Sequence, residues 1–151
     1  MPSHSETRTL PYSAKQMYDL VADVEDYPAF LPWTAAARIK SRDPQGDVEI
    51  MIADLVISFK VFRERFSSKV TLVEGDNRIE TEYLDGPFKY LHSTWRFEDA
   101  SDDDTPRCHV QFDVSFEFKS RLLQGAAGMF FNEAMQRIVR AFETRAKALY
   151  D

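Results

Sequence analysis

The sequence has little cysteine and no long apolar run. Cys108 is the single cysteine among 151 residues, so an internal disulfide is excluded and a reducing compartment fits. No segment approaches the ~18 consecutive apolar residues of a membrane-spanning helix. The start, MPSHSETRTLPYS, lacks the apolar stretch of a signal peptide. These absences predict a soluble, cytoplasmic protein.

Basic residues are outnumbered by acidic ones. The chain carries 19 Lys and Arg against 25 Asp and Glu, a net charge of −6. Phosphate binding needs a basic surface, so DNA is not an expected partner, although a local basic patch stays open. Apolar residues make up 44% of the chain. This composition predicts one globular domain over residues 1–151 with a substantial core.

Catalytic signatures are also missing. The chain has no HExxH, CxxC, GxSxG, P-loop or GxGxxG motif, and its three histidines lack metal-ligand spacing. We therefore expect no metal, no cofactor and no enzyme. The remaining candidates for acid–base chemistry are Asp54, Glu64, Tyr83 and His92, and no pair of them has diagnostic spacing. For Asp54 and Glu64 we consider an orientation toward the concave face of a sheet, where an acid is either structural or a general base.

What is present begins with a strand and two short helices. Residues 5–10 are predicted to form a strand. Ser13 and Gln16 have the spacing of a capping box, and an amphipathic helix follows, with Met17, Leu20, Val21 and Val24 on one face. A second short helix is predicted from Asp26 to Leu31, where Pro32 stops it.

A strand-rich middle extends from Thr34 to Lys119. The clearest strand is CHVQFDVSFEF, in which every second residue is apolar, as in a half-buried antiparallel strand. Val48, Ile50 and Ile52 likewise alternate with polar or smaller residues. With the first strand, the pattern predicts about seven antiparallel strands.

The final segment, Ser120 to Tyr150, is predicted to form one long helix of about 28 residues, spanning roughly 40 Å. The resulting fold class is α+β: a curved antiparallel sheet wrapped on a long C-terminal helix. The helix opens with LLQGAAGMFF, residues 122–131, which has two glycines and almost no charge. Close packing against the sheet explains this composition, and so does an apolar helix end that opens a portal or touches a membrane.

Aromatic residues are abundant, with 12 Phe, 6 Tyr and 2 Trp. They either fill a core or line an elongated apolar cavity between sheet and helix, and composition leaves both readings open. The positions predicted to point inward and to form the cavity wall are Phe62, Phe66, Tyr83, Leu91, Trp95, Phe112, Val114, Phe116, Phe130, Ala134 and Ile138.

Two stretches carry a family resemblance. YDLVADVEDYPAFLPW and DGPFKYLHSTWRF resemble the paired signatures of the coenzyme Q-binding START-like family, in the polyketide cyclase/dehydrase group. Thr34 is a departure, because many members have Cys after the Trp. The resemblance implies a helix-grip fold over nearly the whole chain and binding of ubiquinone in support of respiration. The family also includes a branch of ribosome-association toxins that act on the large ribosomal subunit.

The resemblance also implies roles for both stretches. VEDYPAFLPW would form a lid over one mouth of the cavity through Tyr27, Phe30, Leu31 and Trp33, or else a plug without a gating role. Asp85-Gly86 supplies a turn with positive φ beside that mouth, followed by Pro87, Phe88 and Lys89. Lys89 is either an exposed strand lysine or a contact for a quinone head or an anionic lipid surface.

The leading hypothesis is therefore a non-enzymatic carrier of ubiquinone or a similar isoprenoid lipid, with transient contact to the inner membrane surface. The alternative is a ribosome-binding protein of the toxin type, with a local basic patch drawn from Arg63, Arg65, Lys69, Arg137 and Arg140. A polyketide cyclase or dehydratase is the third reading.

Overall fold

Within the described residues, the fold consists of seven strands, two α-helices and two 3-10 helices. The computed structural model describes residues 3–59 and 62–150, without the side chains of residues 59, 62, 123 and 126–132. The elements in chain order are β1 (Ser3–Leu10), α1 (Ala14–Ala22), η1 (Val24–Ala29), β2 (Thr34–Gln45), β3 (Val48–Phe59), β4 (Phe62–Val73), η2 (Glu74–Asp76), β5 (Arg78–Asp85), β6 (Phe88–Asp99), β7 (Cys108–Phe118) and α2 (Arg121–Tyr150).

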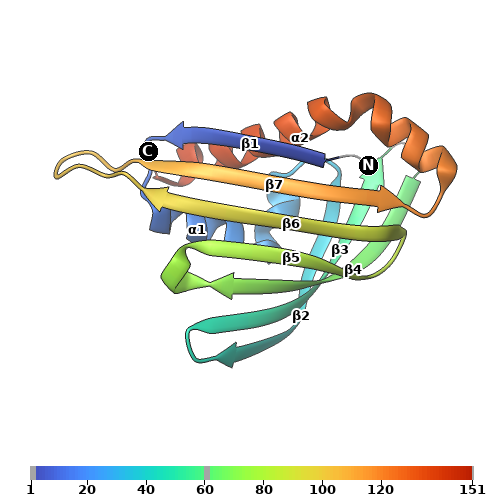
Figure 1. Ribbon diagram of the computed structural model, residues 1–151, viewed down its shortest axis with the longest axis horizontal. Coiled ribbons are helices and arrows are strands. Elements are labelled where there is room, and N and C mark those ends of the chain that lie inside the picture. The colour runs from blue at the N-terminus through green and yellow to red at the C-terminus, as the bar shows by residue number, and fades with distance from the viewer. Residues whose placement is uncertain (1–2, 60–61, 151) are drawn as a thin grey trace.

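The strands form one antiparallel sheet in the order β1-β7-β6-β5-β4-β3-β2. Except for β1, each strand pairs with its neighbours in sequence, while β1 pairs with β7. Figure 1 shows α2 running alongside β1 and β7, from the end where β7 finishes back toward α1. The predicted curved sheet with a long C-terminal helix is thus confirmed.

The first helix starts as its sequence predicts. The backbone N–H of Gln16 donates to Ser13 Oγ at 3.1 Å, and the N–H of Ser13 donates to Gln16 Oε1 at 2.8 Å. These two bonds satisfy otherwise unpaired donors at the start of α1. The capping box is therefore confirmed.

The predicted second short helix is confirmed, but its bounds differ from the expected ones. Val24–Ala29 forms a 3-10 helix with Pro28 inside it, whereas an element from Asp26 to Leu31 was expected. The chain turns directly after the last residue of α1, because Asp23 serves both as C-cap of α1 and as N-cap of η1. The N–H of Leu31 then donates to the carbonyl of Tyr27 at 2.8 Å, which closes the segment.

In β3, the alternating residues Val48, Ile50 and Ile52 do not form the face that packs on the core. Met51 and Ala53 are fully buried, while Val48, Ile50 and Ile52 are half-buried on the outer face of the sheet. The register explains this, since Ala53 lies opposite the buried Ser68 and Ile52 opposite Lys69. A strand with apolar residues on both faces does not reveal its core face by alternation alone.

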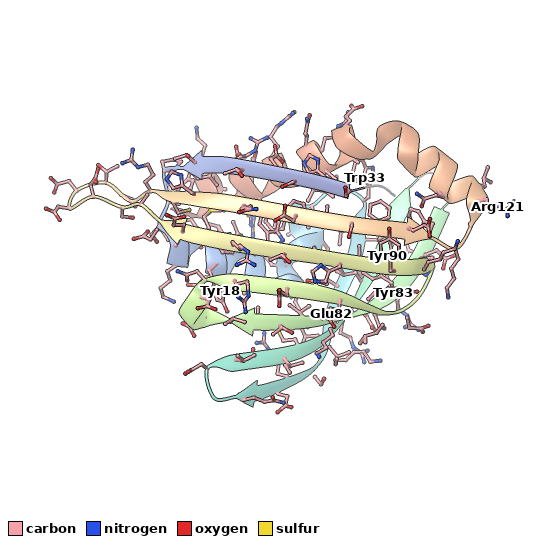
Figure 2. The ribbon with its side chains drawn as sticks, viewed as in Figure 1. Tyr18, Trp33, Glu82, Tyr83, Tyr90 and Arg121 are labelled. Atoms are coloured by element: carbon pink, nitrogen blue, oxygen red, sulfur yellow. The ribbon has the colours of Figure 1, made fainter. Side chains whose placement is uncertain are left out.

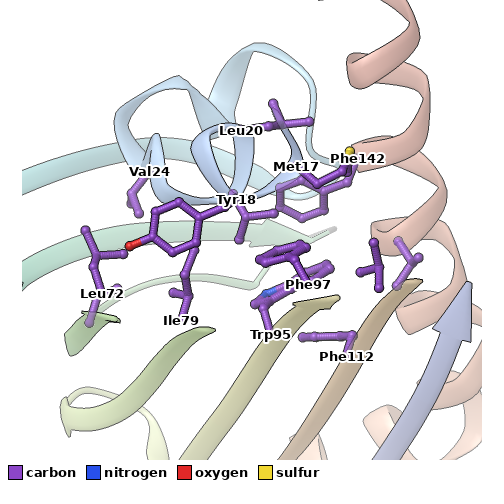
Figure 3. Packing of buried hydrophobic residues seen from close by; sticks show 14 of the residues in the cluster. Met17, Tyr18, Leu20, Val24, Leu72, Ile79, Trp95, Phe97, Phe112 and Phe142 are labelled. Carbon is purple, nitrogen blue, oxygen red and sulfur yellow. The ribbon is translucent and has the colours of Figure 1, made fainter. Parts of the chain in front are cut away.

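The core lies between the sheet, α1 and the C-terminal half of α2 (Figure 3). Trp95 stacks on Phe112 with ring centroids 4.3 Å apart, and Phe142 of α2 meets Trp95 edge-on at 5.0 Å. Tyr18 of α1 packs edge-on against Phe97 at 6.3 Å. Aromatic contacts thus join both helices to the sheet, beside aliphatic core residues such as Met17 and Val139.

Candidate ligand-binding interior

One aromatic cluster lies on the concave face where β5 and β7 end and β6 begins. Phe88 is at its centre, and its ring centroid lies 5.3 Å from Phe66, 5.6 Å from Tyr83, 5.7 Å from Phe116 and 4.6 Å from Phe118. Phe88 is buried, and its backbone N–H donates to the hydroxyl of Tyr83 at 3.2 Å. The structure therefore joins predicted wall residues to a residue predicted at the mouth.

A second cluster surrounds Trp95 and Phe112 in the middle of the sheet. A small apolar cavity of about 10 Å³ lies beside them, with Leu10, Met17, Val139 and Phe142 among its lining residues. Such a volume holds about one water molecule. None of these four residues was predicted as a wall, although Met17 was placed on the apolar face of the first helix.

The same cavity has a polar rim that sequence reasoning missed. Arg8 Nη1 donates to Glu143 Oε1 at 2.6 Å, and Arg8 Nη2 donates to Glu6 Oε1 at 2.8 Å. Partial burial alone would lower the pKa of Arg8, but the hydrogen bonds that Arg8 donates to Glu6 and Glu143, together with the charges of these carboxylates, outweigh burial and raise that pKa. The sequence indicates this rim only weakly. Glu6 and Arg8 share a face of the edge strand β1 with the buried Leu10.

One buried polar atom belongs to the concave face itself. The Ser68 hydroxyl is buried and has no hydrogen-bond partner among the described residues. Ser68 lies opposite Ala53 on one side and Tyr83 on the other. A buried hydroxyl without a partner is uncommon and costs free energy. It is therefore a candidate polar contact for a ligand on this face.

The other predicted wall residues occupy varied positions. Val114 is buried in β7, Leu91 and Ile138 are partly buried against the core, and Ala134 is half-buried on α2. The side chains of Phe62 and Phe130 lie outside the described residues. Burial is expected of a filled core as well as of a cavity wall, so the wall assignment stays a prediction.

The predicted lid segment is tied to the C-terminal half of α2. The rings of Tyr27 and Phe30 meet Phe142 edge-on at 5.5 and 5.3 Å. Arg145 binds Asp26 at 2.8 Å and lies 5.4 Å from the Phe30 ring centre. The Tyr27 hydroxyl donates to the carbonyl of Val21, and burial raises its pKa. These contacts clamp η1 against α2.

The lid segment ends in an unusual backbone conformation. Leu31 is partly buried against the core, and Trp33 has φ of 61°. Positive φ is uncommon for a bulky residue and is found more often at functional or tightly constrained positions. The carbonyl of Trp33 accepts from the N–H of Ser58 at 2.8 Å, which attaches the segment to β3.

The turn before β6 needs its glycine. Gly86 has φ of 142°, and a Cβ built there would lie 2.6 Å from Phe66 Cβ. Pro87 accepts from the N–H of Lys119, just before α2, and Lys89 is exposed with its Nζ 3.6 Å from Glu117. This turn therefore adjoins the start of α2, roughly 32 Å along the helix axis from the nearest contact of η1, at Phe142.

The four candidate acid–base residues do not converge. Asp54 is on the outer face, where it accepts from Ser67 Oγ at 2.5 Å, so the inward orientation considered for it was wrong. His92 is exposed opposite Glu82, and Glu64 is exposed on β4. Tyr83 alone among the four joins the aromatic cluster. In the described part of the chain, no three His, Cys, Asp or Glu side chains gather as metal ligands would.

Together, these features define a protein of the helix-grip, START-like class, with a concave aromatic face. The family model described as polyketide cyclase / dehydrase and lipid transport matches residues 10–143. The chain belongs to this family, and the resemblance seen in its two signature stretches is confirmed.

Two kinds of curated relative are similar to the chain. The ribosome association toxin RatA from Rickettsia prowazekii is 39% identical over 150 residues, which is 97% of each chain. The mitochondrial coenzyme Q-binding protein COQ10 homolog B from Xenopus laevis is 34% identical over 148 residues, covering 97% of this chain and 59% of that protein. Sequence similarity alone thus supports both branches that the resemblance implied.

Solved structures agree on the fold. The 18 kDa protein CC1736 from Caulobacter crescentus is 34% identical, with a TM-score of 0.78 and 99% of each chain covered. The ZhuI aromatase/cyclase from Streptomyces has a TM-score of 0.79 over 97% of this chain and 93% of that one, at 16% identity, and shows the fold alone. Among the described residues, no helix is both long and apolar enough to cross a membrane.

Proposed function

We propose that this protein binds an isoprenoid quinone such as ubiquinone between the concave face of the sheet and α2, and that it carries the quinone without catalysing a reaction. The observation that carries the proposal is the buried apolar row of β7 from Phe112 to Phe116. Its two ends are aromatic, Phe116 against Phe88 and Phe112 against Trp95, and Val114 lies between them. Transfer of an apolar tail from water into such an interior is favourable by roughly 25 cal/mol per Å². Relatives named for coenzyme Q binding support the choice of ligand.

Ligand entry requires movement. The cavity of about 10 Å³ beside Trp95 is far smaller than the ~300–1,000 Å³ of a typical small-molecule pocket. Binding therefore displaces side chains or part of α2. The clamp between η1 and α2 is polar and partly exposed at Asp26 and Arg145, so it is a suitable place to open. Because this clamp holds the segment VEDYPAFLPW, the proposal gives that segment the role of a lid.

Ser68 supplies the polar contact in this proposal. Its hydroxyl donates to a carbonyl oxygen of the quinone head, which satisfies a group that is otherwise buried without a partner. Asp54 and His92 take no part, because both lie on the outer face. A carrier of this kind works in the cytoplasm with transient contact to the inner membrane, and it needs no cofactor.

Extraction of the purified protein with organic solvent, followed by mass spectrometry, tests the proposal directly. We expect a co-purified quinone, and we expect added ubiquinone to quench the fluorescence of Trp95 in the interior. A Trp33→Phe variant assigns the quenching to Trp95, since these are the two tryptophans in the chain. An extract free of lipid, together with no uptake of added quinone, would reject the proposal.

A second candidate function is binding to the ribosome. Arg63 and Arg65 are exposed on β4, and Lys69 is on its outer face opposite Ile52. Cations beside the half-buried apolar side chains of β3 form a surface suited to phosphate and base contacts. Several relatives named as ribosome association toxins support this candidate.

Co-sedimentation with ribosomal subunits at two salt concentrations tests this candidate. Binding that weakens steeply with salt, and that Arg65→Glu abolishes, supports it. Lys147→Glu is the control, because Lys147 is an exposed cation in the last turn of α2. Absence of binding at low salt would reject the candidate.

A further inference from the structure

Charge is distributed unevenly along the long axis of the molecule. One end carries the acidic loop between β6 and β7, with Asp102, Asp103 and Asp104, and the acidic η2 with Glu74 and Asp76. Figure 1 shows this loop at the far left, beyond the C-terminal end of α2. This end therefore carries a group of exposed acids, of which Asp102 pairs with Arg107 and Asp76 with Arg78.

The opposite end is basic and apolar. It comprises the end of β5, the turn into β6, the end of β7 and the start of α2, which the hydrogen bond from Lys119 N–H to the Pro87 carbonyl holds together. Figure 2 shows Arg121 and Tyr90 toward this end and Tyr18 toward the other. We call this surface the strand-end face, and its outward residues are Arg65, Leu84, Lys89, Lys119, Arg121 and Leu122.

Two exposed leucines distinguish the strand-end face from an ordinary charged surface. Leu122 is 83% exposed and Leu84 is 50% exposed, although large apolar side chains in water are unfavourable. The cations Arg65, Lys89, Lys119 and Arg121 lie at the same end of the molecule, together with the acids Glu64, Asp85 and Glu117, of which Glu117 pairs with Lys89. Leucines framed by cations are what an anionic lipid interface accommodates: apolar tips enter the headgroup region while ammonium and guanidinium groups meet phosphates.

We propose that the strand-end face docks on an anionic phospholipid bilayer, with the acidic loop directed away from the membrane. The proposal rests on the proposed function, since it assigns the surface from which the carrier exchanges its lipid. Attraction at one end and repulsion at the other orient the molecule. In this orientation the aromatic cluster around Phe88 lies directly behind the docked face, because Phe88 follows the turn at Pro87.

A bilayer fits this face better than RNA does. Each cation near an anionic membrane strengthens binding by roughly fivefold. RNA phosphates attract the same cations, but RNA has no apolar phase into which Leu122 and Leu84 could both transfer from water. Among the described residues of β4, which carries Arg63 and Lys69, no large apolar side chain is exposed.

Vesicle flotation tests the proposal with the full-length protein. Vesicles of phosphatidylcholine, with and without phosphatidylglycerol and free of quinone, are mixed with the wild type at low and high salt. We expect flotation only with phosphatidylglycerol and only at low salt. Leu84→Asp and Lys119→Glu should each weaken flotation at least fivefold, and Leu122→Asp should do the same.

Matched controls come from the other end of α2. Leu149 is 50% exposed, like Leu84, and Lys147 is exposed, like Lys119. Leu149→Asp and Lys147→Glu should leave flotation unchanged, and thermal melts confirm that each variant folds. Equal losses in both sets, or a wild type that never floats, would overturn the proposal.

The remaining outcomes separate the two proposals. If the protein floats with vesicles but takes up no quinone, the docking proposal is supported and the proposed quinone function is rejected. A protein that takes up quinone but does not float rejects the docking face alone. If the wild type does not bind vesicles, and the Leu84 and Lys119 variants lose binding to ribosomal subunits, the strand-end face binds RNA. The membrane proposal is then wrong.

Discussion

At the scale of single residues, the Ser68 hydroxyl offers a direct test of ligand recognition. Ser68→Ala removes a buried group that lacks a partner, so the variant should be as stable as the wild type or more stable by about 1 kcal/mol. It should bind ubiquinone more weakly, yet bind a polyprenol of the same tail length unchanged. Urea denaturation and fluorescence titration measure the two effects.

Ser67 provides the control for this prediction. Its hydroxyl is on the opposite face of the same strand and donates to Asp54. Ser67→Ala should leave quinone affinity unchanged and should lose a little stability. If Ser68→Ala and Ser67→Ala bind quinone equally well, Ser68 is not the polar contact.

Ala134 tests the cavity wall from the side of the helix. If this half-buried residue lines a cavity, Ala134→Trp fills that space, blocks quinone uptake and leaves the melting temperature almost unchanged. If it only packs in a filled core, the tryptophan overpacks the site and costs about 1–3 kcal/mol. Gln136→Trp, at an exposed position of the same helix, should change neither uptake nor stability. Early melting with uptake intact would contradict the wall assignment.

At the scale of secondary-structure elements, the clamp between η1 and α2 allows a test of the proposed lid. Arg145→Ala removes the ion pair with Asp26 and the contact with the Phe30 ring. Because both partners are partly exposed, the loss of stability should be modest, about 1 kcal/mol. Under the lid proposal, stopped-flow mixing should show faster quinone exchange, with association and dissociation both accelerated.

Arg137 is the matched control for the clamp. It pairs with Glu133 one turn away on the exposed side of α2, whereas Arg145 pairs with Asp26 of η1. Arg137→Ala should therefore leave exchange rates unchanged. Unaltered exchange in Arg145→Ala would show that η1 is a plug without a gating role.

At the scale of the whole molecule, Cys108 reports on opening of the fold. It is fully buried where β7 pairs with both β1 and β6, and burial, followed by the charge of Asp99, raises the pKa of its thiol to about 11. At pH 8 the thiol is therefore protonated and shielded, and a thiol reagent should label it only after unfolding.

Labelling in native buffer and in urea measures this difference. An Asp103→Cys variant adds a thiol in the exposed acidic loop, which should react at once in native buffer. Rapid, complete labelling of Cys108 in the native wild type would mean that the β1 edge opens readily.

Local patterns in the sequence determined the elements and their order. The Ser13–Gln16 capping box, the strict alternation in β7 and the apolar stripe of α2 each arise from interactions within a few residues or one element. Physical rules of short range are enough to predict such features. The paired signature stretches added the family and its fold, and both are confirmed.

Only the tertiary structure decided which faces and which distant residues meet. The core face of β3 depends on its register with β4, because apolar residues occupy both of its faces. The same register places Asp54 outside. Arg8 meets Glu143 across 135 positions, and Asp26 meets Arg145 across 119. Such contacts follow from how a curved sheet closes on a helix, and no local period in the sequence encodes them.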